Sequence, residues 1–255
     1  MDPATLVGLV VGFGGVIAMI FLEGSSPMSI LLPAPMILVF GGTFGAALAG
    51  GTLRDFLAAM RAIPRAFTAK VPSSDESIDT IVSLADRARR EGLLALEDDA
   101  RKIEDPFLRD GLRAAIDGTD PEDLRVILED RIGAKRKADR VLSKIFQDMG
   151  GYAPTIGIVG TVVSLVHVLE NLSDPEKLGH MIAAAFVATL WGIASANLMW
   201  LPISARLRRI SDLECERMEI VLEGLLSVQS GANPRLVGER LRSLLPPARD
   251  LKDAA

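Results

Sequence analysis

Four long stretches of the chain contain no charged side chain. They are residues 3–22, 24–53, 149–169 and 178–205, and they are 20, 30, 21 and 28 residues long. A helix of about 20 apolar residues can cross a bilayer because it satisfies its own backbone hydrogen bonds where no water is available. A soluble domain rarely contains four such stretches. The pattern therefore predicts an all-α polytopic membrane protein with four transmembrane helices.

The polar part of the chain carries signals for the start and end of helices. Ser73-Ser74-Asp75-Glu76 has the form of a capping box, and Gly92 is a natural stop, so a helix is predicted between them. A short helix is predicted over Leu93–Lys102, and another after Asp105-Pro106. No segment alternates apolar and polar residues strongly enough to predict a strand.

Further helix signals connect this region to the uncharged stretches. Asp120 is a good cap because Pro121 occupies the first helical position, where its missing N–H needs no partner. This helix is predicted to reach about Asp148 and to continue into the third stretch. Apolar residues at helical spacing carry the fourth stretch on into the C-terminal tail, where Asn233-Pro234 begins one last short helix.

Lysine and arginine are distributed so unevenly that they predict the topology. Of 28 such residues, 18 lie in residues 51–150, nine follow residue 205, and Lys177 alone lies between the last two stretches. Positive charge is retained on the cytoplasmic side. We therefore expect a multi-pass protein of the cytoplasmic (inner) membrane with both termini in the cytoplasm. The expected segments are 1–53 (transmembrane helices 1 and 2), 54–148 (a helical cytoplasmic region), 149–205 (transmembrane helices 3 and 4) and 206–255 (a helical cytoplasmic tail).

Composition excludes several classes of function. The chain has one cysteine, Cys215, and two histidines, with neither CxxC nor HExxH, so neither a disulfide framework nor a metal site is expected. It lacks a GxxxxGK[ST] loop for nucleotide phosphates. A net charge of −5 gives no signal for nucleic acid. We therefore expect no enzymatic activity, no cofactor and no nucleic-acid partner.

The third and fourth uncharged stretches each present a narrow helix face of small residues. These are Ala153, Gly157, Thr161 and Ser164 in the third, and Ala185, Thr189, Gly192 and Ala196 in the fourth. Small residues allow helices to approach closely in lipid. The faces could pack against each other inside the chain, or they could surround a helix from another chain.

Two hydroxyls and two prolines within these stretches are candidate functional residues. Thr161 and Thr189 can bond to their own helix backbone, or they can line a polar path for Na⁺ or for water that carries protons. Pro154 is compatible with a helix start, whereas Pro202 can bend the helix at the inner end of the fourth stretch.

Acidic residues are absent from all four stretches. A protein that transports protons or sodium usually needs an ionisable group within the membrane to bind and release the ion. If this chain helps to conduct an ion, the titrating acid must come from another polypeptide.

Four segments resemble the MotA/PomA family of flagellar motor stator subunits. They are Met1–Gly8, Ala153–Thr161, Ala188–Gly192 and Gly231–Arg235, with the sequences MDPATLVG, APTIGIVGT, ATLWG and GANPR. The likeness covers nearly the whole chain: two spans, a cytoplasmic region, two spans and a cytoplasmic tail. More distantly, the last two spans are similar to those of the ExbB/TolQ energisers, which lack this N-terminal pair of spans followed by such a region.

The resemblance implies a stator subunit that couples ion flow to torque. It implies a homo-oligomeric ring, a pentamer in the family, which lies in membrane lipid around a dimer of MotB/PomB-like subunits. The single membrane helix of that partner supplies the missing Asp, and another of its domains grips peptidoglycan. The coupling ion is H⁺ or Na⁺, with the hydroxyl of Thr161 slightly favouring sodium, and no other cofactor is implied.

The resemblance also implies roles for individual residues. Pro154, Thr161 and Thr189 match positions on the ion pathway. Pro154 and Pro202 match positions linked to conformational coupling. Close packing around the partner helix is expected of Ala153, Gly157, Ser164, Ala185, Gly192 and Ala196.

The segment Ala88–Asp98 resembles the part of the family that contacts the rotor protein FliG. Arg89 and Glu97 match its best-defined charged positions, and Arg90 and Asp98 are adjacent candidates. Basic residues precede an apolar stretch and acidic residues follow it, and exposed charges of this kind steer a partner more than they bind it. On the residues alone, the alternative is a solvated helix end with opposite charges four residues apart.

Two other functions stay open on the sequence. One is an ExbB/TolQ-like proton-channel energiser of outer-membrane processes, and the other is a structural membrane scaffold without ion flow. A neighbouring gene for a single-span, peptidoglycan-binding protein would favour the stator. Ion-dependent rotation would exclude the scaffold.

Overall fold

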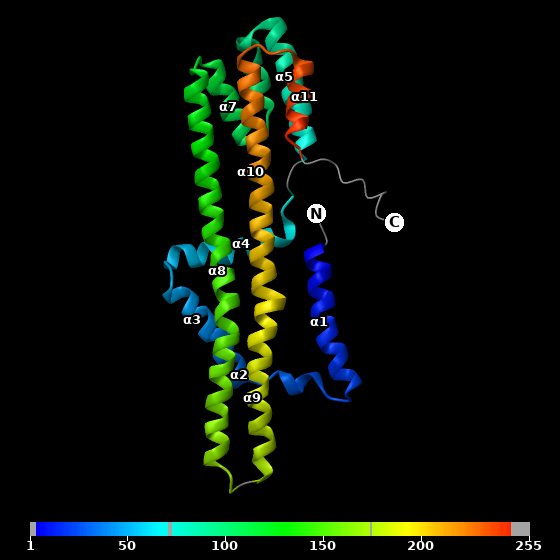
Figure 1. Cartoon of the computed structure of the whole chain (residues 1–255), viewed down its shortest axis with the longest axis vertical. Coiled ribbons are helices and arrows are strands. Elements are labelled where there is room, and N and C mark those ends of the chain that lie inside the picture. Colours follow the sequence, from blue (N-terminus) through cyan, green and yellow to red (C-terminus); the bar gives the residue numbers. More distant parts are fainter. Residues whose placement is uncertain (1–3, 71–72, 174, 246–255) are drawn as a thin grey trace. The chain divides into compact units, whose positions relative to one another are not determined.

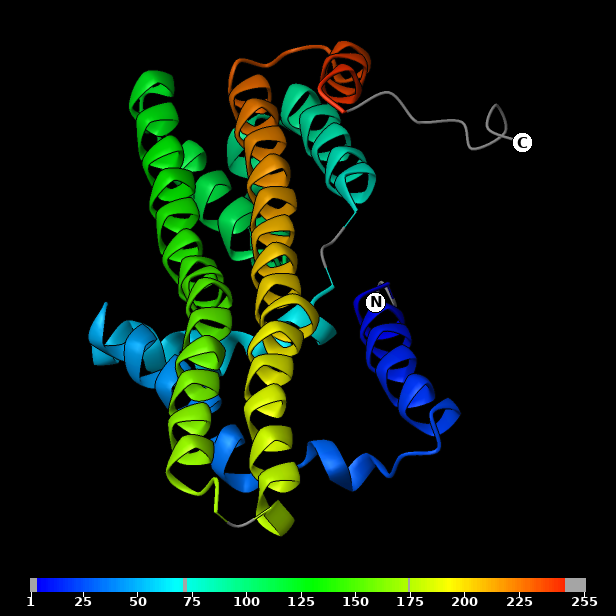
Figure 2. The ribbon, with the colours of Figure 1, turned by 60° about the horizontal axis from the view of Figure 1, so that its bottom comes forward.

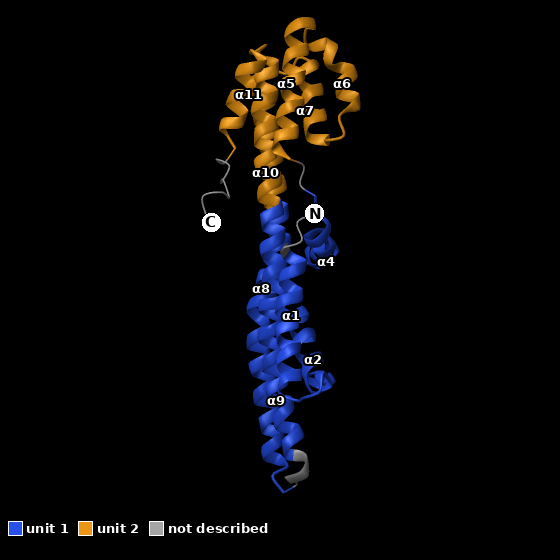
Figure 3. Ribbon diagram, turned by 90° about the vertical axis from the view of Figure 1, so that its right-hand side faces the viewer, with its two compact units in different colours: residues 1–70, 138–210 blue, residues 71–137, 211–255 orange. Residues whose placement is uncertain are grey.

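The structure is a computed structural model that describes residues 4–70, 73–173 and 175–245, and all regular structure in these ranges is helical (Figure 1). The prediction of an all-α protein is thereby confirmed. The chain divides into two compact units (Figure 3), which we describe separately. Unit 1 comprises Met1–Lys70 and Ala138–Ile210, and unit 2 comprises Val71–Lys137 and Ser211–Ala255.

These units do not follow the four expected segments. Residues 54–70 group with the apolar helices instead of the remaining cytoplasmic region, and residues 211–255 of the tail group with residues 71–137. The reason is that α8 (Pro121–Glu170) and α10 (Leu201–Gln229) are each continuous through a predicted boundary. A boundary drawn where charge changes therefore falls inside a helix.

Unit 1 contains the apolar helices. They are α1 (Ala4–Leu22), α2 (Pro33–Met36), a π turn (Ile37–Gly41), α3 (Gly42–Ala49), the second part of α8, α9 (Pro175–Ser195), a π turn (Ala196–Trp200) and the start of α10. Three described helices are long and apolar enough to cross a membrane: Thr5–Leu22, α8, and the continuous run Leu178–Gln229. Residues 5–22 of the first uncharged stretch, and the whole of the third and fourth, lie in these helices.

The second uncharged stretch forms a shorter apolar helix, Pro33–Ala49. Two prolines delay its start, because a 3-10 turn (Pro27–Ile30) and an extended Leu32 come before Pro33. The helix ends before Gly50. At about 1.5 Å per residue it is somewhat shorter than the hydrocarbon core of about 30 Å. The count of four transmembrane helices therefore stays a prediction.

An amphipathic helix that the sequence patterns did not predict, α4 (Leu53–Thr68), completes unit 1. Its cap is the hydroxyl of Thr52, which accepts a hydrogen bond from the Asp55 N–H at 3.1 Å. The ring of Phe56 packs edge-on against Phe44 of α3, with centroids 6.1 Å apart. Arg65 forms an ion pair with Asp139 of α8 at 3.0 Å. These contacts explain why α4 belongs with the apolar helices.

Unit 2 begins its helices where the capping signals predict. It contains α5 (Ser74–Glu91), a 3-10 turn (Leu93–Leu96), α6 (Glu97–Lys102), α7 (Pro106–Ile116), the first part of α8, the end of α10 and α11 (Pro234–Ser243). Side-chain oxygens of Ser73, Asp105, Asp120 and Asn233 each accept a hydrogen bond from the N–H two residues later. Gly92 ends α5 with a φ of 83°. The predicted helix over Leu93–Lys102 is a 3-10 turn followed by α6.

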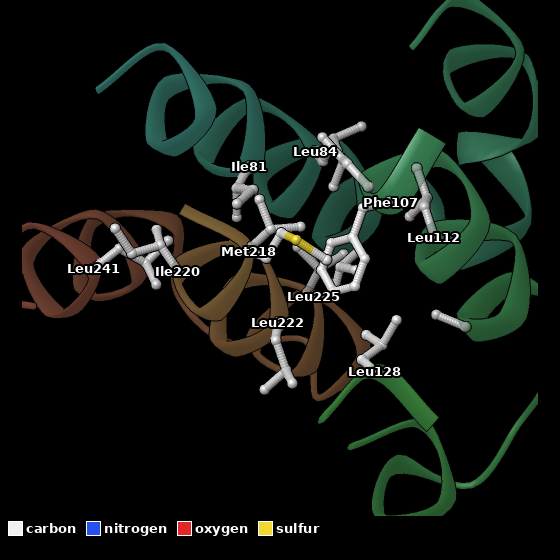
Figure 4. Close-up of a cluster of buried hydrophobic side chains, with 14 of the residues drawn as sticks. Ile81, Leu84, Phe107, Leu112, Leu128, Met218, Ile220, Leu222, Leu225 and Leu241 are labelled. Atoms are coloured by element: carbon white, nitrogen blue, oxygen red, sulfur yellow. The ribbon is translucent and has the colours of Figure 1, made fainter. Parts of the chain in front are cut away.

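The core of unit 2 is an apolar cluster to which α5, α6, α7, α8, α10 and α11 all contribute, and Figure 4 shows part of it. It includes Ile81 and Leu84 of α5, Phe107 and Leu112 of α7, Leu128 of α8, Met218, Leu222 and Leu225 of α10, and Leu241 of α11. Gly111 lets α7 approach closely, because a Cβ there would lie 2.5 Å from Leu225 Cδ1. At its edge, Arg217 pairs with Asp105 at 2.6 Å. This tight packing gives the charged turn between α5 and α6 a rigid support.

Candidate functional site: a glycine-packed helix pair and a charged turn

Helices α8 and α9 run side by side in opposite directions (Figure 2) and touch backbone to backbone. A Cβ on Gly157 would lie 2.8 Å from the carbonyl oxygen of Ala188 and 3.2 Å from the Cα of Gly192. A Cβ on Gly192 would lie 2.8 Å from the carbonyl oxygen of Ala153. Contacts this short leave room for glycine alone, as in other close helix crossings in lipid.

Most of the small residues predicted to face a partner helix are buried within this chain. Ala153, Gly157, Ala185, Gly192 and Ala196 are buried, and Ser164 is half-buried. At the glycine crossing, the structure shows packing between two helices of the same chain. A role for these six residues around a partner helix stays a prediction.

The crossing brings the two candidate hydroxyls together. The side chains of Thr161 and Thr189 hydrogen-bond to each other, although the residues are 28 positions apart. The Thr161 hydroxyl also lies 3.1 Å from the carbonyl oxygen of Gly157 and 3.2 Å from that of Ala185. Two hydroxyl and two carbonyl oxygens therefore gather at one half-buried point. Oxygen atoms of these types are ligands that a hard cation prefers.

The two prolines lie within long helices. Pro154 is inside α8, which begins at Pro121, so it is not a helix start. It has no N–H to donate to the carbonyl four residues earlier. Pro202 follows a π turn, Ala196–Trp200, in which the Leu201 N–H donates five residues back to the Ala196 oxygen. A π turn is a recognised place for a helix to change direction or register.

The charged residues predicted to contact a rotor lie on both sides of one turn of unit 2. Arg89 and Arg90 are in the last turn of α5, Glu97 and Asp98 are in the first turn of α6, and all four are exposed. Arg90 pairs with Asp86, and Glu97 pairs with Arg101 at 2.7 Å. Among the described parts of the chain, neither Arg89 nor Asp98 has an ion-pair partner within 4.0 Å. The Arg89 charge is therefore available to another surface, whereas the Asp98 carboxylate also interacts electrostatically with Arg101.

The side chain of Arg87 connects the two helices on either side of this turn. Arg87 donates to Glu91 at 3.1 Å and across to Asp99 of α6 at 2.7 Å. The hydrogen bond to Glu91, and then the one to Asp99, raise the pKa of Arg87 above its ordinary value. Leu94, between the basic and acidic groups, is 76% exposed, whereas Leu96 is fully buried. The sequence of the apolar run 93–96 alone does not reveal which of these two leucines is exposed.

Two apolar helices that pack through paired glycines and bring two hydroxyls together define a class of membrane protein, and comparisons with known proteins give its family. Residues 99–220 match the MotA/TolQ/ExbB proton channel family, and residues 6–92 match the motility protein A N-terminal family. Motility protein A of Bacillus subtilis (strain 168) is 33% identical over 100% of this chain and 94% of its own length. Chemotaxis protein PomA of Vibrio alginolyticus is 34% identical over 96% of each chain.

Solved structures give the same result. The chain is similar to the flagellar MotAB stator complex from Bacillus subtilis, with a TM-score of 0.90 and 33% identity over 99% of this chain and 100% of that one. It is also similar to C. jejuni MotAB, with a TM-score of 0.92 and 25% identity over 98% of each chain. The chain belongs to the motility protein A family. The prediction of a flagellar stator subunit of the inner membrane is thereby confirmed.

Proposed function

We propose that this stator subunit forms an ion-conducting channel together with a MotB-like partner and applies torque to the rotor protein FliG. The observation that carries the proposal is the oxygen cluster of Thr161 and Thr189 at the glycine crossing, in stretches of chain that contain no carboxylate. Two of the similar solved structures are MotAB complexes. A partner helix that carries an Asp next to these oxygens would complete a path for H⁺ or Na⁺.

In this proposal, copies of the chain form a homo-oligomeric ring, a pentamer, in membrane lipid around a dimer of the partner. Binding of the ion neutralises the partner's Asp, which changes the helix packing that is preferred. The ring then moves against the partner, which is fixed to peptidoglycan. Pro154 and the π turn before Pro202 are the places where the helices can yield.

The proposed topology rests on the distribution of lysine and arginine along the chain. The abundance of arginine in residues 206–209 supports a cytoplasmic position for the inner end of the α9–α10 run. Both termini and unit 2 are then cytoplasmic, where the turn between α5 and α6 can meet the rotor. No cofactor other than the coupling ion is part of the proposal.

The function is tested in a strain whose only stator is this chain with its partner. We expect swimming that requires both polypeptides and whose speed falls when one ion gradient is removed. Speed measured against external sodium at constant pH identifies the ion: saturable dependence indicates Na⁺, and no dependence with sensitivity to a protonophore indicates H⁺. Swimming that persists without the partner, or cation flux through the chain reconstituted alone, would contradict the proposal.

Reversal of the free positive charge at the turn should impair contact with the rotor. Arg89→Glu is expected to reduce swimming several-fold without lowering the amount of protein in the membrane, because Arg89 has no ion pair among the described residues that would be lost. Charge changes on the rotor should restore part of the speed. Lys137→Glu, at an exposed residue of α8, is the matched control and should swim normally. Failure of every rotor charge change to rescue Arg89→Glu would exclude a direct contact.

A further inference from the structure

We propose that a small apolar cavity in unit 1 binds the hydrocarbon tail of a membrane lipid. The cavity has a volume of about 150 Å³ and lies between α1, the 3-10 turn Pro27–Ile30 and α9. Val16 and Ile17 are part of its α1 wall, and Trp191 and Ala194 are part of its α9 wall. Every described residue that lines the cavity is apolar.

The lining gives water almost no hydrogen-bond partner. Its one polar side-chain group among the described residues is the indole N–H of Trp191, which donates to the carbonyl oxygen of Ile30 at 2.6 Å. Buried water needs about two to four polar partners, and an apolar cavity of about 150 Å³ stays dry and can bind benzene. Hydrocarbon is therefore the chemical class that this cavity accepts.

The position of the cavity along α1 places it among acyl chains. Phe13 and Ile17 line the cavity, and they precede Leu22, the end of the first uncharged stretch, by nine and five positions. At about 1.5 Å per residue, this wall lies about 7–14 Å inside that end of the stretch. The hydrocarbon core of a bilayer is about 30 Å thick. The cavity is therefore at the depth of lipid tails in either orientation of the helix.

The cavity is continuous with the exposed apolar surface of α1, a helix that is long and apolar enough to cross a membrane. Ile17 and Leu31 both line the cavity and are 45% and 41% exposed. On the same helix, Val10 and Val11 are 65% and 68% exposed. A lipid tail that covers these side chains can enter the cavity without crossing a polar layer.

The size of the cavity distinguishes a lipid tail from a helix of a second copy of the chain. A helix with its side chains is about 10–12 Å wide, so it cannot enter a space that holds roughly one benzene molecule. A flexible acyl chain, one methylene wide, can enter it. The lining has no charged side chain among the described residues to select a headgroup, so we expect binding to depend on the tail.

Photolabelling measures the position of the tail residue by residue. The full chain with its partner is reconstituted in vesicles of phosphatidylethanolamine and phosphatidylglycerol that contain a phosphatidylcholine with a diazirine in one tail. After illumination, labelled residues are identified by mass spectrometry. We expect labels on Leu190 and Trp191 in the cavity, as well as on Val10 and Val11 on the exposed surface. Labels on the two valines without any on Leu190 or Trp191 would overturn the proposal.

Variants that fill the cavity should remove only the labels inside it. Ala194→Phe introduces a benzene-sized ring from the α9 wall, and Val16→Phe introduces one from the α1 wall. Each should lose most of the label on Trp191 and keep the label on Val10. Ala183→Phe places the same side chain at an exposed position of α9 that does not line the cavity, and it should label like the wild type.

Three results with these variants would contradict the inference. One is undiminished labelling of Trp191 in both filled variants, and another is an equal loss of that label in Ala183→Phe. The third is a loss of oligomer mass in the filled variants alone, because side chains of a second copy would then occupy the cavity. None of these readouts depends on ion flow or torque, so they test the lipid site separately from the proposed function.

Discussion

Replacement of Gly192 by valine should abolish swimming and reduce the amount of folded protein in the membrane. The added Cβ would lie 2.8 Å from the carbonyl oxygen of Ala153 and 3.0 Å from the Cα of Gly157. Both are backbone atoms, so α8 and α9 must separate. Overpacking of a filled site costs about 1–3 kcal/mol, and more where backbone has to move. Swimming speed and thermal unfolding of the solubilised complex measure the effect.

Gly179→Val on the same helix is the matched control. It introduces the same side chain, but no atom lies within 4 Å of a Cβ at this position. We expect near-normal stability and swimming. Gly157→Val should resemble Gly192→Val, since its Cβ would meet the carbonyl oxygen of Ala188. Wild-type stability of Gly192→Val would mean that the two helices do not cross at these glycines.

Removal of the hydroxyl at Thr189 or Thr161 should reduce ion-driven torque while the protein stays in the membrane. A hydrogen bond to a charged group contributes about 1.5–3 kcal/mol, so loss of one oxygen from the pathway is expected to slow ion transfer about tenfold or more. Thr189→Ala and Thr161→Ala should therefore swim slowly. Thr189→Ser and Thr161→Ser, which keep the oxygen, should retain most of the torque. Motor speed under a fixed load is the measurement.

Thr43→Ala controls for the loss of any membrane hydroxyl. The hydroxyl of Thr43 is buried in α3 and donates to the carbonyl oxygen of Val39 in its own helix segment at 2.6 Å. We expect normal torque from this variant. If cells with the Thr161→Ala or Thr189→Ala protein swim as fast as cells with the Thr43→Ala protein, the ion does not pass the two hydroxyls.

Local signals made much of the fold predictable. Caps at Ser73, Asp105, Asp120 and Asn233 act within a few residues, so short sequence patterns were sufficient to place the helix starts. The length of the second apolar helix was less predictable, because an absence of charge does not reveal that Pro33 starts it. The amphipathic helix α4 was missed, since its place depends on distant contacts with α3 and α8.

The candidate site was predictable by residue type but not by arrangement. Small faces on two apolar stretches indicated close packing, yet periodicity cannot tell whether the facing helix belongs to the same chain. Only the positions of Gly157 and Gly192 in space show that they meet each other. The exposure of Leu94 beside buried Leu96 likewise depends on the 3-10 turn that the structure has in place of a regular helix.

The backbone contact at the glycine crossing has a mechanical consequence. Two helices in contact through bulky flexible side chains can slide or twist separately, since the side chains change rotamer to follow. Gly157 and Gly192 have no side chain to adjust, so a rotation of either helix about its own axis drives neighbouring side chains into the other backbone. The pair is therefore torsionally stiff. A torque applied to one of the two helices is therefore transmitted to the other at this crossing, and the two helices move together.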